Sequence, residues 1–499
     1  DRYGTAAALA RDLHAYLDGH IVSAQCATAG YRFTKFLQRN TWQVAAGTAL
    51  ILSLFAGIVV ATWQWRQAQA ERERAELFAR QSREMARSLI FELHESLLKV
   101  PGTTAARALL LDRSTRFLDS LAAASSADPD LQLELAEAYR KLAAVEGDAR
   151  TENLGNRAAS IESLSKGLAL ARAALPSRKY HARAEAITIE LLGDQISALR
   201  DTGDREGVAN AVFDLTRMLN QADPRASSQA NRESRALAWR QLGNEHAESG
   251  RNAEAREAYE KSRALYEGLM AESAVSKEVA TQYSSTLKRL GALAVAEKRL
   301  PEANELYTKA LSIERGLVSK NPTGRGLRLS LVHTLGHLGF VQRESGQPDE
   351  ALRLYQEALQ LSEAAMREEP ENQRARWSVA STLHNLGGLY AQLAWFPQCR
   401  ESYQRALLLR EEMSQRTPES RSYQLAAART RAGFGQALVE EAAKALSGKE
   451  KTVAMQRARN LLGQALPVFE ERAAKKELAG SDAEEPERIR ASLARLAQM

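Results

Sequence analysis

Apolar residues at helical spacing run along most of this chain, and their pattern repeats. A pair of the type Leu-Gly returns at nearly equal steps, of about 50 residues at first and about 48 residues afterwards. A fixed period of this length indicates stacked supersecondary units, each burying its apolar face against the next. No stretch alternates apolar and polar residues as a half-buried strand does, so the predicted fold class is all-α. The pairs are Leu142-Ala143, Leu192-Gly193, Leu242-Gly243, Leu290-Gly291, Leu338-Gly339, Leu386-Gly387 and Phe434-Gly435.

One well-formed unit shows what is repeated. In residues 236–270, Leu242 and Gly243 share a helical face, a turn follows at Ser249-Gly250, and Tyr259 lies on a second helix. We expect the small Gly243 to let the two helices approach, and Tyr259 to fill the space between them. The same aromatic position returns with the same period, at Tyr307, Tyr355 and Tyr403.

The motif in this unit is Trp239-x2-Leu-Gly, then Ala255 and an aromatic residue. A later position is proline in most of the other units. The motif resembles the tetratricopeptide (TPR) repeat, whose usual period is about 34 residues. Each unit here has about 14 residues more, so both helices should be longer than usual. The resemblance covers residues 128–472 and implies an α-solenoid of about seven helical hairpins with a period of about 48 residues. Residues 147–156 and 447–452 interrupt the outer units.

A membrane span is predicted before the repeats. Residues 41–64 contain no charged side chain and are long enough to cross a hydrocarbon core. Trp42 stands at one end, and Trp63 and Trp65 at the other, as in an aromatic belt. The alternative is a buried core helix, but the length, the belt and the charged flanks together favour a transmembrane helix in a lipid bilayer.

The segments on both sides of the span are charged. Residues 65–100 interleave arginine with glutamate and are predicted to form a charged juxtamembrane helix, followed by a helical connector at residues 101–127. More arginines follow the span than precede it, so the positive-inside rule does not favour an inside N-terminus. The span itself contains small residues that would let two such helices meet, so a homodimer is one expected partner. They are Gly47, Ser53 and Gly57.

Residues 1–20 form an amphipathic helix with the motif Leu9-x-x-Asp12-Leu13, then Tyr16-Leu17-x-Gly19. They resemble the last helix of a bacterial Ser/Thr protein kinase catalytic domain. A basic juxtamembrane linker at residues 21–40, a single span, a charged helix and repeats follow, in the order found in bacterial receptor-like kinases. The resemblance implies that this chain is the C-terminal portion of such a kinase, serving signal transduction by protein phosphorylation in the full-length protein.

That resemblance also implies a location and a set of cofactors. A kinase must face ATP, so the N-terminus is expected in the cytoplasm, the span in the inner (cytoplasmic) membrane, and the repeats in the periplasm or outside the cell. This chain has no glycine-rich loop, no His-Arg-Asp and no Asp-Phe-Gly motif. We therefore expect no catalytic activity from it, and no cofactor; ATP and Mg would belong only to the missing kinase domain.

The first helix of each repeat is expected to line a groove for a protein or peptide ligand. Such a basic, amide-containing groove suits an acidic segment or a C-terminal carboxylate. The alternative is that these residues are ordinary exposed side chains. The net charge of +6 is spread along the chain, so no nucleic-acid partner is expected. The groove candidates are Arg240, Asn244, Lys288, His333, Phe340, Arg343 and His384.

Two further hypotheses remain open. His333 and His337 are four residues apart on one helical face, a spacing that suits a metal. No third ligand and no complete metalloprotease motif accompany them, so we favour helix-surface or groove histidines and expect no metal. The chain can also be a free-standing membrane-bound TPR scaffold or envelope assembly factor with no kinase. Residues 473–499 are expected to form a charged C-terminal tail.

Overall fold

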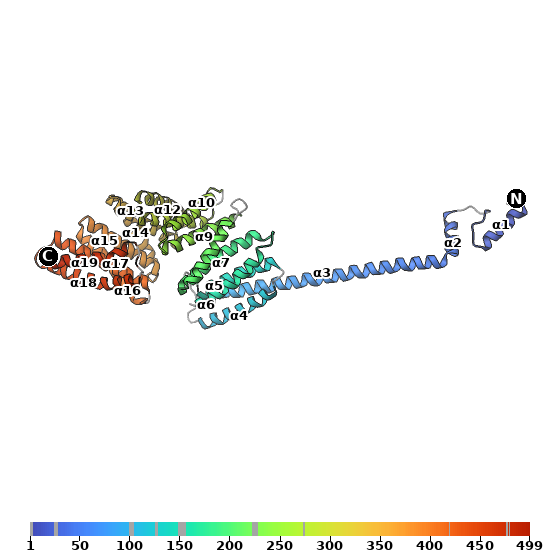
Figure 1. The fold of residues 1–499 in the computed structure, drawn as a ribbon, viewed down its shortest axis with the longest axis horizontal. Helices are drawn as coiled ribbons and strands as arrows, with labels where there is room; N and C mark the ends of the chain where they lie inside the picture. Colours follow the sequence, from blue (N-terminus) through green and yellow to red (C-terminus); the bar gives the residue numbers. More distant parts are fainter. Residues whose placement is uncertain are drawn as a thin grey trace. The chain divides into compact units, whose positions relative to one another are not determined.

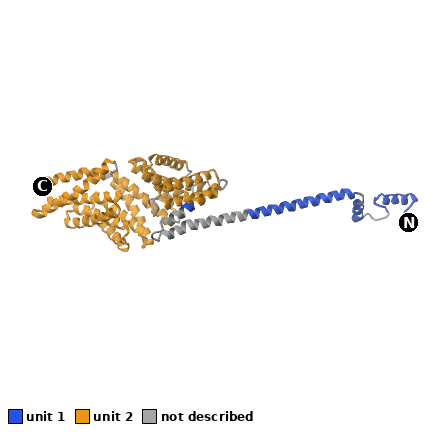
Figure 2. Cartoon of the chain, turned by 90° about the horizontal axis from the view of Figure 1, so that it is seen from below, with its two compact units in different colours: residues 1–114 blue, residues 115–499 orange. Residues whose placement is uncertain are grey.

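The computed structural model describes residues 3–23, 28–98, 104–124, 128–147, 156–221, 228–272, 275–418, 420–475, 478 and 480–499. Within these ranges the side chains at 38–39, 72–111, 124, 147, 201 and 480–481 are not described. The chain divides into two compact units, residues 1–114 and residues 115–499 (Figure 2). The ordered elements of both units are helices, and the described residues contain no strand.

The described part of the first unit forms three helices and the start of a fourth. α1 (Ala6–Leu17) begins after Thr5, whose hydroxyl accepts a hydrogen bond from the Ala8 amide, and α2 (Ala29–Arg39) begins after Thr28 in the same way. α3 (Thr41–Leu98) is one continuous helix of 58 residues over both the uncharged run and the charged stretch that follows it (Figure 1). α4 (Thr104–Ala124) begins within the expected connector.

The described residues of the second unit form seven successive helical hairpins, which confirms the predicted TPR-like α-solenoid. Their helices in the central units have 19 to 21 residues, longer than in a repeat of about 34 residues, as predicted. The hairpins are α5 (Pro129–Gly147) with α6 (Arg157–Ala174), α7 (His181–Thr202) with α8 (Arg205–Gln221), α9 (Gln229–Glu248) with α10 (Asn252–Met270), α11 (Lys277–Ala296) with α12 (Leu300–Lys320), α13 (Arg325–Glu344) with α14 (Pro348–Glu368), α15 (Gln373–Gln392) with α16 (Phe396–Arg416), and α17 (Arg421–Lys444) with α18 (Gly448–Ala474).

Each central hairpin closes on the glycine and tyrosine that the sequence singles out. Gly243 on α9 faces Tyr259 on α10, and a Cβ added to Gly243 would lie 2.5 Å from the ring. Tyr259 is 2 % exposed, so it is buried between its two helices, as predicted. The glycine is required because any side chain there would push the paired helices apart.

The turn inside each of the four central hairpins uses a left-handed residue that also repeats. Gly250, Lys298, Gly346 and Ala394 occupy the same position in successive units, and all have φ between 57° and 75°. In every case the next residue donates its amide proton to the carbonyl five residues earlier, as Arg251 does to His246 at 2.8 Å. This bond satisfies carbonyls that the end of a helix leaves without partners.

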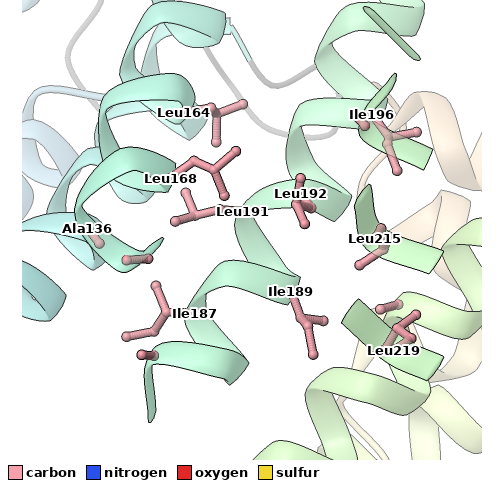
Figure 3. Close-up of a cluster of buried hydrophobic side chains, with 14 of the residues drawn as sticks. Ala136, Leu164, Leu168, Ile187, Ile189, Leu191, Leu192, Ile196, Leu215 and Leu219 are labelled. Carbon is pink, nitrogen blue, oxygen red and sulfur yellow. The ribbon is translucent and has the colours of Figure 1, made fainter. Parts of the chain in front are cut away.

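Leucine and isoleucine side chains hold the first two hairpins together. Leu164 and Leu168 of α6, Leu191 and Leu192 of α7 and Leu215 of α8 converge in one buried cluster (Figure 3). α7 contributes to both sides of this cluster, since its residues pack against α6 in one direction and α8 in the other. The hairpins therefore share one continuous core, as stacked repeats do.

The chain departs from the plain repeat at both ends of the solenoid. The first interruption lies outside the described residues at 148–155. The second, at residues 447–452, does not form a loop, because α18 begins at Gly448 and is lengthened to 27 residues. The expected charged tail contains a short 3-10 helix, η1 (Gly480–Glu484), and α19 (Glu485–Gln498), which buries Ile489 and Leu496 against the last hairpin.

Candidate protein-binding surface

The first helices of the early hairpins lie side by side and enclose a hollow of about 1130 Å³. Its walls come from α5, α7, α9 and α11, together with the residues just before α7 and α9. Seven basic and four acidic side chains line it, so its charge is positive. The basic residues are Arg140, Lys141, Lys179, Arg183, Arg200, Arg240 and Arg289, and the acidic ones are Glu137, Glu190, Asp194 and Glu248.

The carboxylates in the wall are committed to ion pairs between neighbouring hairpins. Arg140 on α5 pairs with Glu190 on α7 and donates through Nε to Asp194 at 2.6 Å. Glu137 pairs in the opposite direction, with an Arg183 nitrogen at 3.1 Å. These bridges fix α5 against α7 and neutralise the acids that face the hollow.

The next pair of hairpins is joined in the same way. Arg200 on α7 lies 3.1 Å from Glu248 and 3.6 Å from Glu245 on α9. With this bridge, all four acidic side chains of the lining have an arginine partner. An acidic ligand would therefore meet no unpaired carboxylate among the described residues of the wall.

Arg289 on α11 differs from Arg140, Arg183 and Arg200, which all have carboxylate partners in the wall. Its side chain is exposed, lines the hollow and has no carboxylate within ion-pair distance among the described residues. Its neighbour Arg240 on α9 donates to the side-chain oxygen of Gln282 on α11 at 2.6 Å. An arginine without a counter-ion at a polar surface is suited to a carboxylate or phosphate of a ligand.

Only two of the seven predicted groove residues line this hollow. They are Arg240 and Asn244, and Asn244 also accepts a hydrogen bond from the Tyr259 hydroxyl at 2.9 Å. Lys288 lies one position from Arg289 but turns into the solenoid, where its ammonium group donates to Glu314 at 2.7 Å and Ser330 at 2.8 Å.

The remaining four candidates lie on α13 and α15. His333 is partly buried, and burial together with the nearby Lys288 and Arg374 lowers its pKa to about 4. The Arg343 guanidinium lies 5.1 Å from the Phe340 ring centre and pairs with Glu344. These side chains take part in contacts within the solenoid, and none of them lines the hollow on α5 to α11.

His384 is held in a mostly basic environment. Its ring meets the Tyr403 ring edge-on with the centres 5.5 Å apart, and its Nδ1 is inaccessible and has no hydrogen-bond partner in the described part of the chain. Burial, then Arg410 and Arg343, lower its pKa well below the usual value, so the ring is neutral at pH 7. A neutral ring of this kind is a packing residue of the α15–α16 hairpin.

No further metal ligand joins His333 and His337 among the described residues. His337 stacks on Tyr307 with the ring centres 5.2 Å apart, and its neighbour His333 faces cations. Across the described residues, no group of three or more His, Cys, Asp or Glu side chains is placed to hold a metal ion.

The chain has a second candidate surface in its first unit. One of the described helices is long and apolar enough to cross a membrane, over Thr41–Glu71, and none of its most apolar stretch is buried in the protein. The tryptophans expected in the aromatic belt are all exposed, with Trp42 at 83 %. This surface belongs to α3 alone.

No protein-family model and no curated protein matches the chain. Solved structures similar to it include the apo form of RapI, at 10 % identity over 83 % of this chain and 99 % of that one, with a TM-score of 0.44. Aspartyl phosphate phosphatase F from Bacillus subtilis is 11 % identical over 84 % and 94 %, with a TM-score of 0.40. BtubC from P. vanneervenii is 16 % identical over 51 % and 91 %, with a TM-score of 0.40. These similarities carry no argument about function, which rests on the side chains of this chain.

Proposed function

We propose that this chain is the membrane anchor and protein-interaction region of a bacterial receptor-like Ser/Thr protein kinase, and that its hollow holds an acidic segment of a partner protein. The observation that carries the binding proposal is the charge of the hollow. Its four carboxylates are ion-paired within the wall, while Arg289 has no counter-ion among the described residues. A ligand carboxylate would supply one.

The anchor follows from α3. None of the most apolar stretch within Thr41–Glu71 is buried in the protein, and apolar side chains exposed over that length are stable in hydrocarbon but not in water. We propose a single pass through the inner membrane, with α1 on the cytoplasmic side and the repeats in the periplasm or outside the cell. The continuous α3 would carry the chain directly from the span to the connector.

The link to a kinase rests on residues 1–20. α1 exposes one apolar face, with Leu13 at 51 % and Leu17 at 76 %, as a helix does when a larger domain packs against it. We propose that this domain is the kinase catalytic domain. A ligand that pairs two chains at their repeats would raise the local concentration of two kinase domains, and so favour phosphorylation between them.

Binding of a fluorescent acidic peptide tests the proposal for the hollow. The full chain is reconstituted in lipid nanodiscs and titrated with a labelled peptide of glutamate and serine, or with a lysine and serine peptide of the same length. We expect binding of the acidic peptide only, weakened by salt because the contacts are electrostatic. Arg289→Glu should weaken it by about tenfold, the effect of an unfavourable charge at an interface.

A matched variant separates the hollow from the overall charge. Arg459 on α18 is exposed, has no ion pair among the described residues and does not line the hollow. Arg459→Glu changes the net charge of the chain as much as Arg289→Glu, yet it should leave the affinity unchanged. Equal loss in both variants, or equal binding of the two peptides, would contradict an acidic-segment site in the hollow.

A further inference from the structure

The segment before the span is not an extended linker. Residues 29–39 form the helix α2, and a single residue, Asn40, separates α2 from α3. Asn40 has φ −115° and ψ 35°, so the chain leaves helical geometry there before α3 starts at Thr41. Figures 1 and 2 both show α2 lying across the axis of α3 instead of continuing it.

The apolar and the basic side chains of α2 lie on different sides of the helix. At about 100° per residue, Phe33, Phe36 and Leu37 fall on one side of the helix. Arg32 and Lys35 fall together on the adjacent side, by the same spacing. Phe33 is 63 % exposed and Phe36 is 56 % exposed, so the protein does not cover the aromatic face.

The charge of this region has one sign. From Gly19 to Ala70 the sequence contains no aspartate or glutamate, while α2 alone contributes three cations, at Arg32, Lys35 and Arg39. The Lys35 ammonium group lies 4.7 Å from the centre of the Tyr16 ring, and no described carboxylate pairs with it. A strongly basic surface next to a span complements the phosphates of anionic lipids.

From these observations we propose that α2 is an interfacial anchor that lies on the leaflet where the span begins and binds anionic lipid headgroups. Phe33, Phe36 and Leu37 enter the boundary between headgroups and acyl chains, and the basic side meets lipid phosphates. The proposal rests on the proposed span, because a helix that lies across the end of a span is parallel to the membrane surface. It gives the anchor a preference for anionic lipid that the uncharged span does not have.

The orientation of α2 fixes which of its side chains meets water. Phe36 and Thr34 are two residues apart and therefore face roughly opposite sides of the helix, at about 160°. Thr34 is exposed, and its hydroxyl donates to the Gly30 carbonyl at 2.9 Å. In the proposed arrangement Phe36 is in lipid and Thr34 faces the solvent.

Cysteine reactivity in nanodiscs tests this arrangement on the full chain. Phe36→Cys and Thr34→Cys are made separately in a Cys26→Ser background. The native Cys399 is buried, and burial raises the pKa of its thiol to about 12, so it does not react. The rate of labelling by a membrane-impermeant maleimide is measured in discs of phosphatidylglycerol and in discs of phosphatidylcholine.

We expect Phe36→Cys to react about tenfold more slowly than Thr34→Cys in phosphatidylglycerol, and the difference to shrink in phosphatidylcholine. Replacing Arg32, Lys35 and Arg39 by glutamine should shrink it in phosphatidylglycerol as well. Equal rates in phosphatidylglycerol would overturn the interfacial anchor. Equal protection in both lipids would overturn the preference for anionic lipid.

A third position separates this proposal from the span itself. Leu54→Cys lies in the middle of the uncharged run and should not react in either lipid if the span crosses the disc. A reactive Leu54→Cys would mean that the uncharged run does not cross the membrane. An unreactive Leu54→Cys, together with equal labelling rates at positions 34 and 36, would contradict the proposal for α2 but not the proposed span.

Discussion

Gly339 on α13 packs directly against the ring of Tyr355 on α14, where an added Cβ would come within 2.6 Å of a ring carbon. Tyr355 is fully buried, so its ring cannot turn aside without displacing its neighbours. Gly339→Ala should therefore destabilise the solenoid by about 1–3 kcal/mol through overpacking. Urea denaturation of the chain in detergent, followed by circular dichroism, measures this loss.

Gly316 on α12 provides the matched control. It is also a helical glycine, but an added Cβ there meets nothing within 4 Å. Gly316→Ala should leave stability unchanged or raise it by up to about 1 kcal/mol, because alanine is the better helix former. A loss at Gly316→Ala as large as the loss at Gly339→Ala would contradict close packing as the cause.

The repeated tyrosines should respond differently to loss of the hydroxyl group. The Tyr355 hydroxyl is buried and finds no hydrogen-bond partner among the described residues, whereas the Tyr259 hydroxyl donates to Asn244. We expect Tyr259→Phe to cost about 1 kcal/mol and Tyr355→Phe to be neutral or stabilising, because removing an unsatisfied polar atom removes its desolvation penalty. Thermal melts of both variants test this; the opposite order would be inconsistent with these contacts.

Substitutions at the left-handed turn position should raise stability in one repeat and lower it in another. Lys298 has φ 59°, where a residue with a Cβ is strained, while the equivalent Gly346 has φ 75°. Lys298→Gly should stabilise the chain by up to about 1 kcal/mol, and Gly346→Ala should destabilise it by about 1 kcal/mol. If glycine at 298 lowers the midpoint of urea unfolding, the turn geometry is wrong at that position.

Glu314 on α12 should make stability depend on pH. Burial alone would raise the pKa of this carboxyl, but Lys288 and the hydroxyls of Thr334 and Ser330 outweigh it, and the pKa is lowered. A carboxyl with a lowered folded pKa stabilises the fold above its unfolded pKa of about 4.3 and loses that contribution as the pH falls through the folded value.

Glu314→Gln should therefore cost about 1.5–3 kcal/mol at pH 7, with a smaller difference from the unaltered chain at pH 3. The control is Glu357→Gln, since Glu357 is partly exposed and pairs with Arg315 at the surface. Its cost should stay within about 1 kcal/mol. Unfolding free energies at the two pH values decide, and a cost for Glu314→Gln that is the same at both would contradict the assigned charge state.

The repeat was predictable from the sequence because its determinants are local. The positions of Gly243 and Tyr259 fix how two helices meet, and an equivalent pair returns in each central unit. The hollow was only partly predictable. The part of its wall that contains Arg140 and Arg183 lies in the first two repeats, whose period is slightly longer. The first repeat also has Ala143 where the later repeats have glycine. The register of the central repeats therefore does not identify Arg140 or Arg183 as lining residues.

The direction of individual side chains on the inner helices was the other part that the sequence did not determine. Lys288 and Arg289 are adjacent; Lys288 was predicted to line the groove, yet it is Arg289 that lines the hollow. Lys288 turns inward because Glu314, a buried acid at a position occupied by Tyr266 in the preceding unit and Ser362 in the following one, needs a cation. The inward direction of Lys288 therefore depends on a single residue of the neighbouring helix. Helical periodicity cannot reveal such a contact.

Hydrogen exchange with and without the acidic peptide tests whether the hollow binds an acidic segment. The full chain in nanodiscs is compared alone and at saturating peptide, and the amides that slow are mapped onto the helices. We expect protection on α5, α7, α9 and α11, whose side chains line the hollow, with little change on α14 and α16. Protection confined to α14 and α16, or no protection at saturating peptide, would contradict a binding site in the hollow.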